Sequence, residues 1–252
     1  MKNNEFSEKP PPFKNILLIY DLDHNWTPNE KKEVTDSVFL LGNSLTQINY
    51  QIEYLEISEN NLEEKLKPYN PEKYIVFNWC ESIPGIPDSE HLVVKILEDS
   101  GFVYTGASAE VLRLSGDKIQ TKKILQSNQI HTPFSKVFCN SDNIEWNIFP
   151  AIVKSATEHC SLDITSHSVV MNINELKERV NHYLKKYNQP ALTEVFIDGR
   201  EFHVSLWGNE NLEILPIAEM DFSALSDIHD RLCTFEAKFV PGSKHYTQIE
   251  TL

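Results

Sequence analysis

The sequence predicts a two-part α/β protein, in which a Rossmann-like domain with a parallel sheet precedes an α+β region with an antiparallel sheet. From Asn15 to about residue 106, short apolar runs alternate with segments of helical i, i+3, i+4 spacing, which is typical of parallel strands joined by helical crossovers. After Asn128, several strand-like runs follow one another without helices, which favours antiparallel pairing. We set the boundary between the two parts near residue 107.

The Rossmann-like domain, residues 15–106, is expected to follow a polar, proline-rich and flexible tail of residues 1–14. Its strands are expected at 15–22, 51–58, 73–79 and 102–106, and its helices at 33–48, 61–69 and 89–101. Ser89 and Gly101 are the expected caps of the last helix. Such sheets bind ligands at the carboxyl ends of their strands, here near 21–24 and 78–81. No GxGxxG follows the first strand, which weighs against a dinucleotide site.

The second region, residues 107–252, begins with a helical stretch. Strands are expected at 135–139, 149–154, 167–171 and 212–217, with a helix at 172–187 and a hairpin at 191–207. Asp198-Gly199 lies between two β-prone runs and predicts a two-residue type I′ turn, which would set Glu194 opposite His203. Because side chains alternate along strands, one face of this hairpin would carry Glu194, Phe196, Glu201 and His203.

Composition and charge narrow the classes of function. The 252 residues are 40% hydrophobic and 24% charged, as in ordinary globular proteins that bury a sizeable core. A net charge of −14 argues against a general binder of nucleic acid or anionic membranes, because no basic field is present to neutralise phosphates. The apolar run at 15–20 is too short to be a membrane or signal helix. The cysteines lack metal-like spacing, which favours reduced thiols in a cytoplasmic protein: Cys80, Cys139, Cys160 and Cys233.

Three lysines occupy positions that a solvated lysine has little reason to choose. Lys154 ends the apolar strand PAIVK, Lys238 lies within FEAKF, and Lys118 follows Gly-Asp at a helix start. Each alone is read more simply as a surface or strand-edge charge. Together with the carboxylates of the expected hairpin, they indicate a site in which cations bind phosphates and acceptors bind ribose and base.

Seven segments of the chain resemble, in order and approximate spacing, the blocks of the ATP-grasp ligases, and most closely their D-alanine–D-alanine ligase branch. The segments are VFNWCESIPG, GFVYTGAS, SGDKIQTKKIL, HTPF, FPAIVKSATEHCSLDI, LTEVFIDGREFHV and LEILPIAEMDF. The resemblance implies an ATP-dependent carboxylate–amine ligase: ATP converts a carboxylate into an acyl phosphate, and an amine then attacks it to form an amide, with Mg²⁺ bridging the phosphates. The implied partners are ATP, a small carboxylate and a small amine or amino acid. A homodimer through the first domain would be usual for the family.

The resemblance also implies roles for individual residues. Lys118, Lys154 and Lys238 would contact the phosphates, and catalysis would depend on Lys154, Lys238 and Ser161. Glu194 would lie beside adenine, and Glu201 would accept hydrogen bonds from the ribose hydroxyls. The hinge beside the base is expected to consist of Val195, Phe196 and Ile197.

Two loops depart from the family pattern. The phosphate loop after Lys154 is small and glycine- or serine-rich in the ligases, whereas larger residues stand here at His159, Cys160 and Asp163. The loop after the first strand, residues 20–26, lacks the family's glycines, its serine and the glutamate that holds a substrate amine. Glu81 is the expected substitute for that glutamate.

The chain also ends at Leu252, before the family segment that supplies an E-x-N for magnesium. We therefore expect the C-terminal part of the ATP-grasp region to be missing, and we identify no metal ligands. Two alternatives to an active ligase stay open. One is a non-catalytic nucleotide-binding remnant or truncated paralogue, and the other is an unrelated two-domain binder of a sugar or metabolite.

Overall fold

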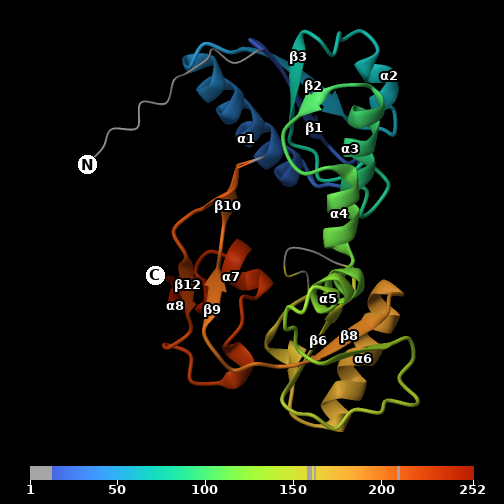
Figure 1. Ribbon diagram of the computed structural model, residues 1–252, viewed down its shortest axis with the longest axis vertical. Helices are drawn as coiled ribbons and strands as arrows, with labels where there is room; N and C mark the ends of the chain where they lie inside the picture. The colour runs from blue at the N-terminus through green and yellow to red at the C-terminus, as the bar shows by residue number, and fades with distance from the viewer. Residues whose placement is uncertain (1–12, 158–160, 162, 209–210) are drawn as a thin grey trace. The chain divides into compact units, whose positions relative to one another are not determined.

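The computed structural model describes residues 13–157, 161, 163–208 and 211–252 (Figure 1). Most of the predicted tail, residues 1–14, therefore lies outside the described residues. Contacts between Cα atoms divide the chain into two compact units between Ser115 and Gly116. The boundary expected near residue 107 falls just before helix α4 (Ala109–Gly116), which this division leaves almost wholly with the first unit.

The first unit is built on a four-stranded sheet in which all neighbouring strands are parallel, as predicted. Its strand order is β2-β1-β3-β4, so the first strand lies inside the sheet between the second and third. The strands are β1 (Asn15–Asp21), β2 (Gln51–Ile57), β3 (Tyr74–Asn78) and β4 (Val103–Tyr104). Every described connection between successive strands carries a helix, which is the Rossmann-like arrangement that the alternating sequence pattern predicted.

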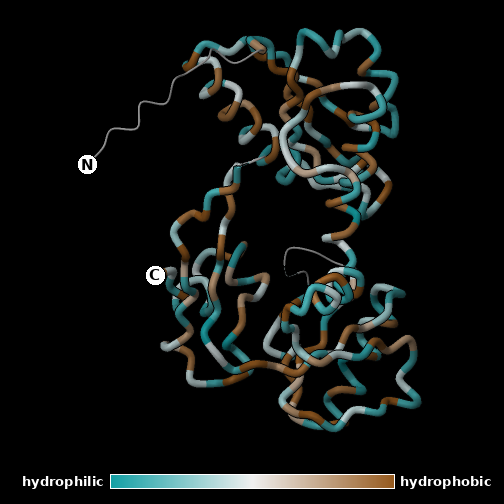
Figure 2. The backbone as a smooth tube through the Cα atoms, in the orientation of Figure 1, coloured by the Kyte–Doolittle hydropathy of each residue, from teal (hydrophilic) through white to brown (hydrophobic). Residues whose placement is uncertain are grey.

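Helices on the two faces of this sheet form two separate cores. Helix α1 (Pro28–Gln47) packs on the face formed by Ile16, Leu18 and Tyr20. Helices α2 (Leu62–Leu66) and α3 (Glu90–Asp99) belong to the core on the opposite face, around Leu17, Ile19 and Val76. The even and odd positions of β1 thus serve different cores, because successive side chains of a strand point to opposite faces. The alternation of hydrophobic and hydrophilic residues along α1 is visible in Figure 2.

One predicted helix start and one predicted helix cap differ from the structure. Helix α1 begins at Pro28 rather than near residue 33, because Thr27 and Glu30 form a reciprocal capping box and Pro28 suits the first turn. Ser89 does not cap α3 with its side chain. Its Oγ instead accepts from the Ile83 N–H at 2.7 Å and donates to the Ile86 carbonyl at 2.5 Å, which holds the preceding loop.

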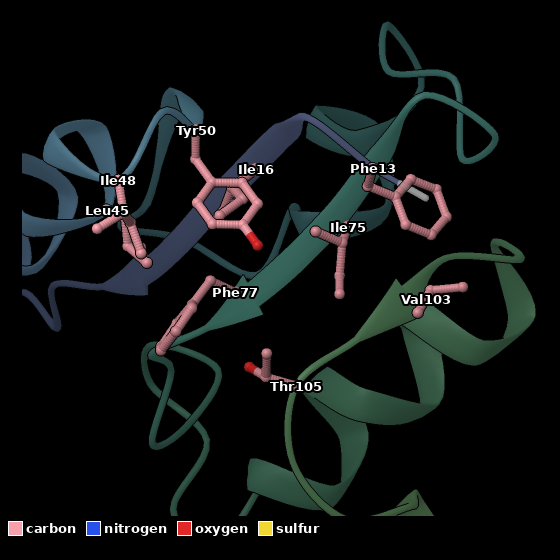
Figure 3. A pocket seen from close by; sticks show the side chains of 9 residues that line it. All are labelled: Phe13, Ile16, Leu45, Ile48, Tyr50, Ile75, Phe77, Val103 and Thr105. Atoms are coloured by element: carbon pink, nitrogen blue, oxygen red, sulfur yellow. The ribbon is translucent and has the colours of Figure 1, made fainter. Parts of the chain in front are cut away.

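An apolar cavity of about 400 Å³ lies on the α1 side of the sheet (Figure 3). Figure 3 shows Ile75 and Phe77 of β3 and Val103 of β4 along one side, with Leu45 and Ile48 of the α1 end opposite. The cavity exists because α1 covers mainly β1 and β2 and leaves the β3–β4 part of this face open.

The second unit contains an antiparallel sheet of strand order β5-β8-β6-β7, as predicted for this region. The strands are β5 (Ser135–Phe138), β6 (Ala151–Ser155), β7 (Val169–Val170) and β8 (Ala191–Val195). Helix α6 (Ile173–Tyr187) packs on one face through Leu176, Val180 and Tyr183. Helix α5 (Lys118–Ser127) precedes the sheet in the chain.

The rest of the second unit consists of short strands and helices. One sheet has the order β13-β12-β9 and a second pairs β10 with β11, all antiparallel. The strands are β9 (Glu201–His203), β10 (Leu206–Trp207), β11 (Glu213–Ile214), β12 (Ala218–Asp221) and β13 (Glu250–Thr251), and the helices are α7 (Phe235–Phe239) and α8 (Lys244–Gln248). Short 3₁₀ helices occur at η1 (Ser166–Ser168) and η2 (Ile228–Asp230). None of the helices in the described ranges is long and apolar enough to cross a membrane.

The predicted hairpin at 191–207 was wrong. Strand β8 pairs with β5 and β6, whereas β9 pairs with β12 in a different sheet. Neither Asp198 nor Gly199 has the positive φ that a type I′ turn requires. Since both edges of β8 are occupied, the chain crosses from one sheet to another between them, and Glu194 and Glu201 do not share a hairpin face.

Candidate active site

Glu194 is the most buried carboxylate of the second unit's candidate site and is held between two lysines. Its Oε1 lies 2.5 Å from the Nζ of Lys122, and its Oε2 forms an ion pair with Lys154. The side chains of Lys122 and Glu194 are only 10% and 8% exposed, whereas that of Lys154 is 27% exposed. Lys154 is therefore the member of this trio that solvent or a ligand reaches most easily.

Strand register explains why these charges meet. Ile152 of β6 lies opposite Glu194 of β8, and Lys154 lies opposite Leu192. Residues two apart on a strand share a face, so Lys154 and Glu194 project from the same side of the sheet. The alternate residues Ala151 and Val153 belong to the core against α6. The charged face is thus the one that α6 leaves free.

The electrostatics follow from this arrangement. Burial by itself raises the pKa of Glu194, but the nearby charge of Lys154 and the hydrogen bonds from Lys122 and Lys154 outweigh it, so the pKa lies below its usual range. One carboxylate facing two lysines leaves an excess of positive charge. A further anion, such as a phosphate, is therefore favoured beside Lys154.

Lys118 begins α5 close to the end of β6. The Asp117 side chain caps this helix by accepting from the N–H groups of Ile119 and Gln120. The backbone N–H of Lys118 donates to the Ala156 carbonyl at 3.0 Å, directly after the strand that carries Lys154. The structure thus brings the Lys118 backbone to the β6 end, where sequence reasoning also expected a phosphate site.

A second group of predicted residues gathers around Cys233. Ser161 Oγ donates to the Cys233 carbonyl at 3.0 Å. Burial raises the pKa of the Cys233 thiol, and the charges of Lys238 and Glu201 act on it in opposite directions, which means that both lie nearby. Glu201 is half-buried on β9, 3.3 Å from the Nε2 of His203, and Lys238 is exposed on α7.

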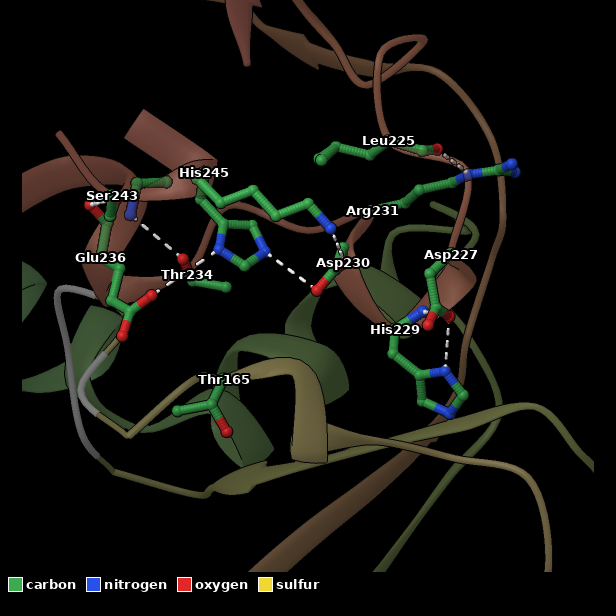
Figure 4. A network of polar contacts seen from close by, with 12 residues as sticks. Thr165, Leu225, Asp227, His229, Asp230, Arg231, Thr234, Glu236, Ser243 and His245 are labelled. Carbon is green, nitrogen blue, oxygen red and sulfur yellow. Dashed lines mark hydrogen bonds and ion pairs between the residues drawn. The ribbon is translucent and has the colours of Figure 1, made fainter. Parts of the chain in front are cut away.

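A polar network holds the helix that carries Lys238 (Figure 4). Thr234 caps α7 through the Ala237 N–H, and the buried ring of His245 lies between two carboxylates. Its Nε2 is 3.3 Å from Asp230 and its Nδ1 is 3.8 Å from Glu236. Figure 4 shows the His245 ring, which belongs to α8, between Glu236 of α7 and Asp230 of the segment between 227 and 231.

The expected hinge has one open backbone donor. The N–H of Val195 donates to the Phe134 carbonyl and that of Phe196 to the Pro150 carbonyl, both at 3.0 Å. The next N–H, of Ile197, finds no acceptor among the described residues, and the Ile197 side chain is exposed. A planar base with an acceptor on its edge is the kind of group that such a donor binds.

Glu81 lies in the first unit, at the carboxyl end of β3. It is exposed, and its backbone N–H donates to Asp21 Oδ1 at 3.1 Å. Asp21 also accepts from Ser82 Oγ at 3.1 Å, and Asp23 accepts from the Gly85 N–H at 2.7 Å. These carboxylates join the loops after β1 and β3, the region in which a doubly wound sheet binds ligands.

The part of the chain that the structure describes contains no group of three or more His, Cys, Asp or Glu side chains arranged to hold a metal ion. His159 and Cys160, which depart from the family loop, lie outside the described residues.

Lys122 is the site residue that sequence reasoning missed. It follows Lys118 by four positions, so both lie on one face of α5, but a lysine in KIQTKKIL resembles a solvated helix residue. The only local signal was this spacing, because its partners Thr132, Pro133 and Glu194 come from later parts of the chain.

Comparisons with known proteins show which family the chain is similar to. The family model of the D-ala D-ala ligase C-terminus matches residues 122–251, just over half of the chain. The chain is 27% identical over 209 residues to a D-alanine--D-alanine ligase from Aquifex aeolicus, covering 82% of this chain and 65% of the relative. It is 35% identical over 167 residues to the uncharacterized protein y4sG from Sinorhizobium fredii, covering 66% of this chain and 48% of the relative.

The fold is also similar to that of solved ligases. The D-alanine--D-alanine ligase from Bacillus anthracis, crystallised with ATP, superposes with a TM-score of 0.63 at 20% identity. The alignment covers 84% of this chain and 67% of the other. The chain spans about half to two thirds of the length of the curated relatives it matches first. From the family model that covers residues 122–251, we conclude that the chain belongs to the D-Ala–D-Ala ligase family of ATP-grasp proteins.

Proposed function

We propose that this protein is an ATP-dependent carboxylate–amine ligase that forms an amide through an acyl phosphate. Family membership supports the class of reaction. The observation that carries the proposal is the pair of lysines around Glu194, because it leaves a partly exposed cation on the sheet face that α6 does not cover. Membership of the family also rules out the alternative of an unrelated metabolite binder.

The proposed reaction has two steps. A carboxylate oxygen of the first substrate attacks the γ-phosphorus of ATP, so that an acyl phosphate forms and ADP leaves. The nitrogen of the amine then attacks the acyl carbon, inorganic phosphate leaves, and the nitrogen loses a proton to give the neutral amide. In such transfers the protein mainly positions the reactants and stabilises negative charge.

We assign the phosphate contacts to Lys118, Lys154 and Lys238. Lys122 keeps Glu194 neutralised in this scheme, which frees Lys154 to turn from the carboxylate to a phosphate. The open N–H of Ile197 suits an acceptor on the adenine edge, with Val195 and Phe196 fixing its direction. Glu201 is the proposed ribose acceptor.

The substrate class follows from the relatives. Several of them are named D-alanine--D-alanine ligases, so D-alanine is the first acid and amine to test. Glu81 is the proposed partner of the substrate amine, because it is an exposed carboxylate at the carboxyl end of β3. We further propose that the protein works in the cytoplasm, where ATP is abundant, and that it forms a homodimer through its first unit.

Thermal unfolding with excess ATP or ADP tests nucleotide binding. A ligand at 100 times its Kd stabilises by about 2.7 kcal/mol, which corresponds to a rise in Tm of roughly 5–11 °C for a chain of this size. Lys154→Ala is expected to abolish the rise. The matched control is Lys136→Ala, which removes a more exposed lysine from β5 of the same sheet and is expected to keep it.

Release of inorganic phosphate from ATP in the presence of D-alanine tests the chemistry. Release that requires the amino acid and is lost in Lys154→Ala supports the ligase. Nucleotide binding without amide formation from any acid and amine would instead identify the alternative, a non-catalytic nucleotide-binding protein. No rise in Tm with either nucleotide would contradict both.

A further inference from the structure

Asp163 occupies a position where the family's phosphate loop usually has a small residue, and its side chain is largely buried and bound by several partners. Its side chain is 11% exposed and its backbone is left-handed, with φ of 58°. Its Oδ2 lies 3.0 Å from a guanidinium nitrogen of Arg179 and 2.7 Å from Nε2 of His182, and its Oδ1 lies 3.1 Å from Nζ of Lys186. One carboxylate therefore gathers three nitrogen donors.

All three donors come from one stripe of α6. Arg179, His182 and Lys186 are spaced i, i+3, i+7, which places them on the same helix face together with Tyr183. The Asp163 carbonyl is bound there too, since it accepts from Arg179 and, at 3.3 Å, from the Tyr183 hydroxyl. Both the side chain and the backbone of Asp163 are thus tied to this helix.

The turn that Asp163 belongs to is joined on its other side to the start of α7. The Ile164 N–H donates to the Ser161 carbonyl at 2.9 Å and closes the turn. Ser161 Oγ donates to the Cys233 carbonyl at 3.0 Å, and the Phe235 N–H donates to the Ile164 carbonyl at 3.3 Å. The turn therefore lies between α6 and the helix that carries Lys238.

We infer that Asp163 is a positioning residue that anchors this turn to α6 and thereby fixes Ser161 and the start of α7 for phosphate binding. This inference rests on the proposed function. A residue needed only for its left-handed backbone would not require three nitrogen donors around its side chain, because glycine adopts that conformation freely. Burial opposes ionisation of Asp163, yet Lys186, Arg179 and His182 together hold its pKa below the usual range, as a charged anchor requires.

Amide hydrogen exchange tests the anchor directly. Asp163→Asn keeps the size and tolerates the left-handed backbone but loses the charge, whereas Asp163→Gly relieves the backbone and loses the side chain. Both are expected to speed exchange at the N–H groups of Ile164 and Phe235 about tenfold or more. The control Val180→Ala destabilises the same helix through its core and is expected to leave the ratio of these rates to those of β8 unchanged.

A milder pair of variants guards against misfolding. Lys186→Ala removes one of the three donors, and Lys185→Ala removes its exposed neighbour, which has no contact with Asp163 among those described. The first is expected to speed exchange at Ile164 about threefold and the second to have no effect. Wild-type rates in Asp163→Gly would overturn the inference, because the residue would then be only a left-handed turn.

Nucleotide affinity tests the consequence for function. In Asp163→Asn the Kd of ATP is expected to rise about tenfold, a common size for coupling between neighbouring sites, while the Kd of adenosine stays unchanged. Equal losses for both ligands, or no loss for either, would overturn the positioning role. If the wild-type protein binds no nucleotide, the proposed function fails, and the positioning role in phosphate binding fails with it. The exchange rates would then decide only whether Asp163 anchors the turn.

Discussion

The Nζ of Lys122 lies 2.5 Å from Oε1 of Glu194, with both side chains almost fully covered. The same Nζ also lies 2.6 Å from Thr132 Oγ1 and 2.7 Å from the Pro133 carbonyl. A lysine has three N–H donors, and all three are used. Lys122 therefore joins α5, the segment before β5 and the end of β8 at one point, and Lys154 is the more exposed of the two lysine partners of Glu194.

Replacing Lys122 by alanine is expected to destabilise the second unit strongly. Breaking a buried ion pair leaves an uncompensated charge and costs about 3–5 kcal/mol, although Lys154 remains and favours the lower end of this range. Urea unfolding followed by far-UV circular dichroism measures the change. Lys123→Ala, at the exposed neighbouring position, is expected to change the free energy of unfolding by less than about 0.5 kcal/mol. An equally small change for Lys122→Ala would refute the role assigned to it.

Glu194 is expected to make stability fall in acid. The lysines lower its pKa in the folded protein, so the unfolded chain binds the proton more tightly and the ionised carboxylate stabilises the fold. This contribution is complete above the pKa of an unfolded glutamate and is lost as pH falls through the folded pKa. The protection factors of β8 amides, which are exchange rates corrected for the intrinsic effect of pH, measure this contribution as a function of pH. Glu194→Gln is expected to remove the fall in stability in this range of pH. An unchanged dependence on pH in the variant would contradict the assignment to Glu194.

Asp21 is expected to have the opposite effect in the first unit. Burial raises its pKa, and the hydrogen bonds from Glu81 and Ser82 reduce the shift without reversing it. The folded protein then binds the proton more tightly than the unfolded chain, so stability falls as pH rises from the ordinary aspartate range through the folded pKa. The protection factors of β1 amides, which are exchange rates corrected for the intrinsic effect of pH, should rise on acidification in this window. Asp21→Asn should remove the dependence, and a dependence that survives the substitution would assign it to another group.

Local periodicity was enough to predict most of the elements and the parallel sheet. The apolar run ending at Asp21 and the amphipathic spacing of α1 are features of neighbouring residues, which a single sequence displays. Lys154 was recognised for the same reason, because it ends an apolar strand. Its partner on β8, Glu194, was recognised as an acidic residue of the site, but its burial was not predicted.

Contacts between residues far apart in the sequence could not be predicted in this way. Lys122 resembles a solvated lysine in the sequence, because its partner Glu194 lies 72 positions further along the chain. Asp163 departs from the family pattern, and its partners on α6 cannot be identified from the neighbouring residues. The segment after β8 was mistaken for a hairpin because its local turn signal is strong. The local preference for a turn was outweighed by tertiary strand pairing, because β5 and β6 occupy both edges of β8.

Gly199→Ala distinguishes the two descriptions of this segment. In a type I′ turn the glycine would have positive φ, and a Cβ there would cost roughly 1–2 kcal/mol. In the structure Gly199 lacks a positive φ, and an added Cβ would meet only Ile197 Cγ2 at 3.5 Å, an ordinary contact. We therefore expect no change in the free energy of unfolding, or a gain of about 0.4–1 kcal/mol from reduced freedom of the unfolded chain.

Gly85→Ala is the positive control. Gly85 has a φ of 82°, and an added Cβ would meet only His24 Cε1 at 3.8 Å, so its surroundings are similarly open. The substitution should lower the free energy of unfolding by about 1 kcal/mol or more through backbone strain alone. Equal destabilisation by both substitutions in urea unfolding would favour the hairpin over the crossover between sheets.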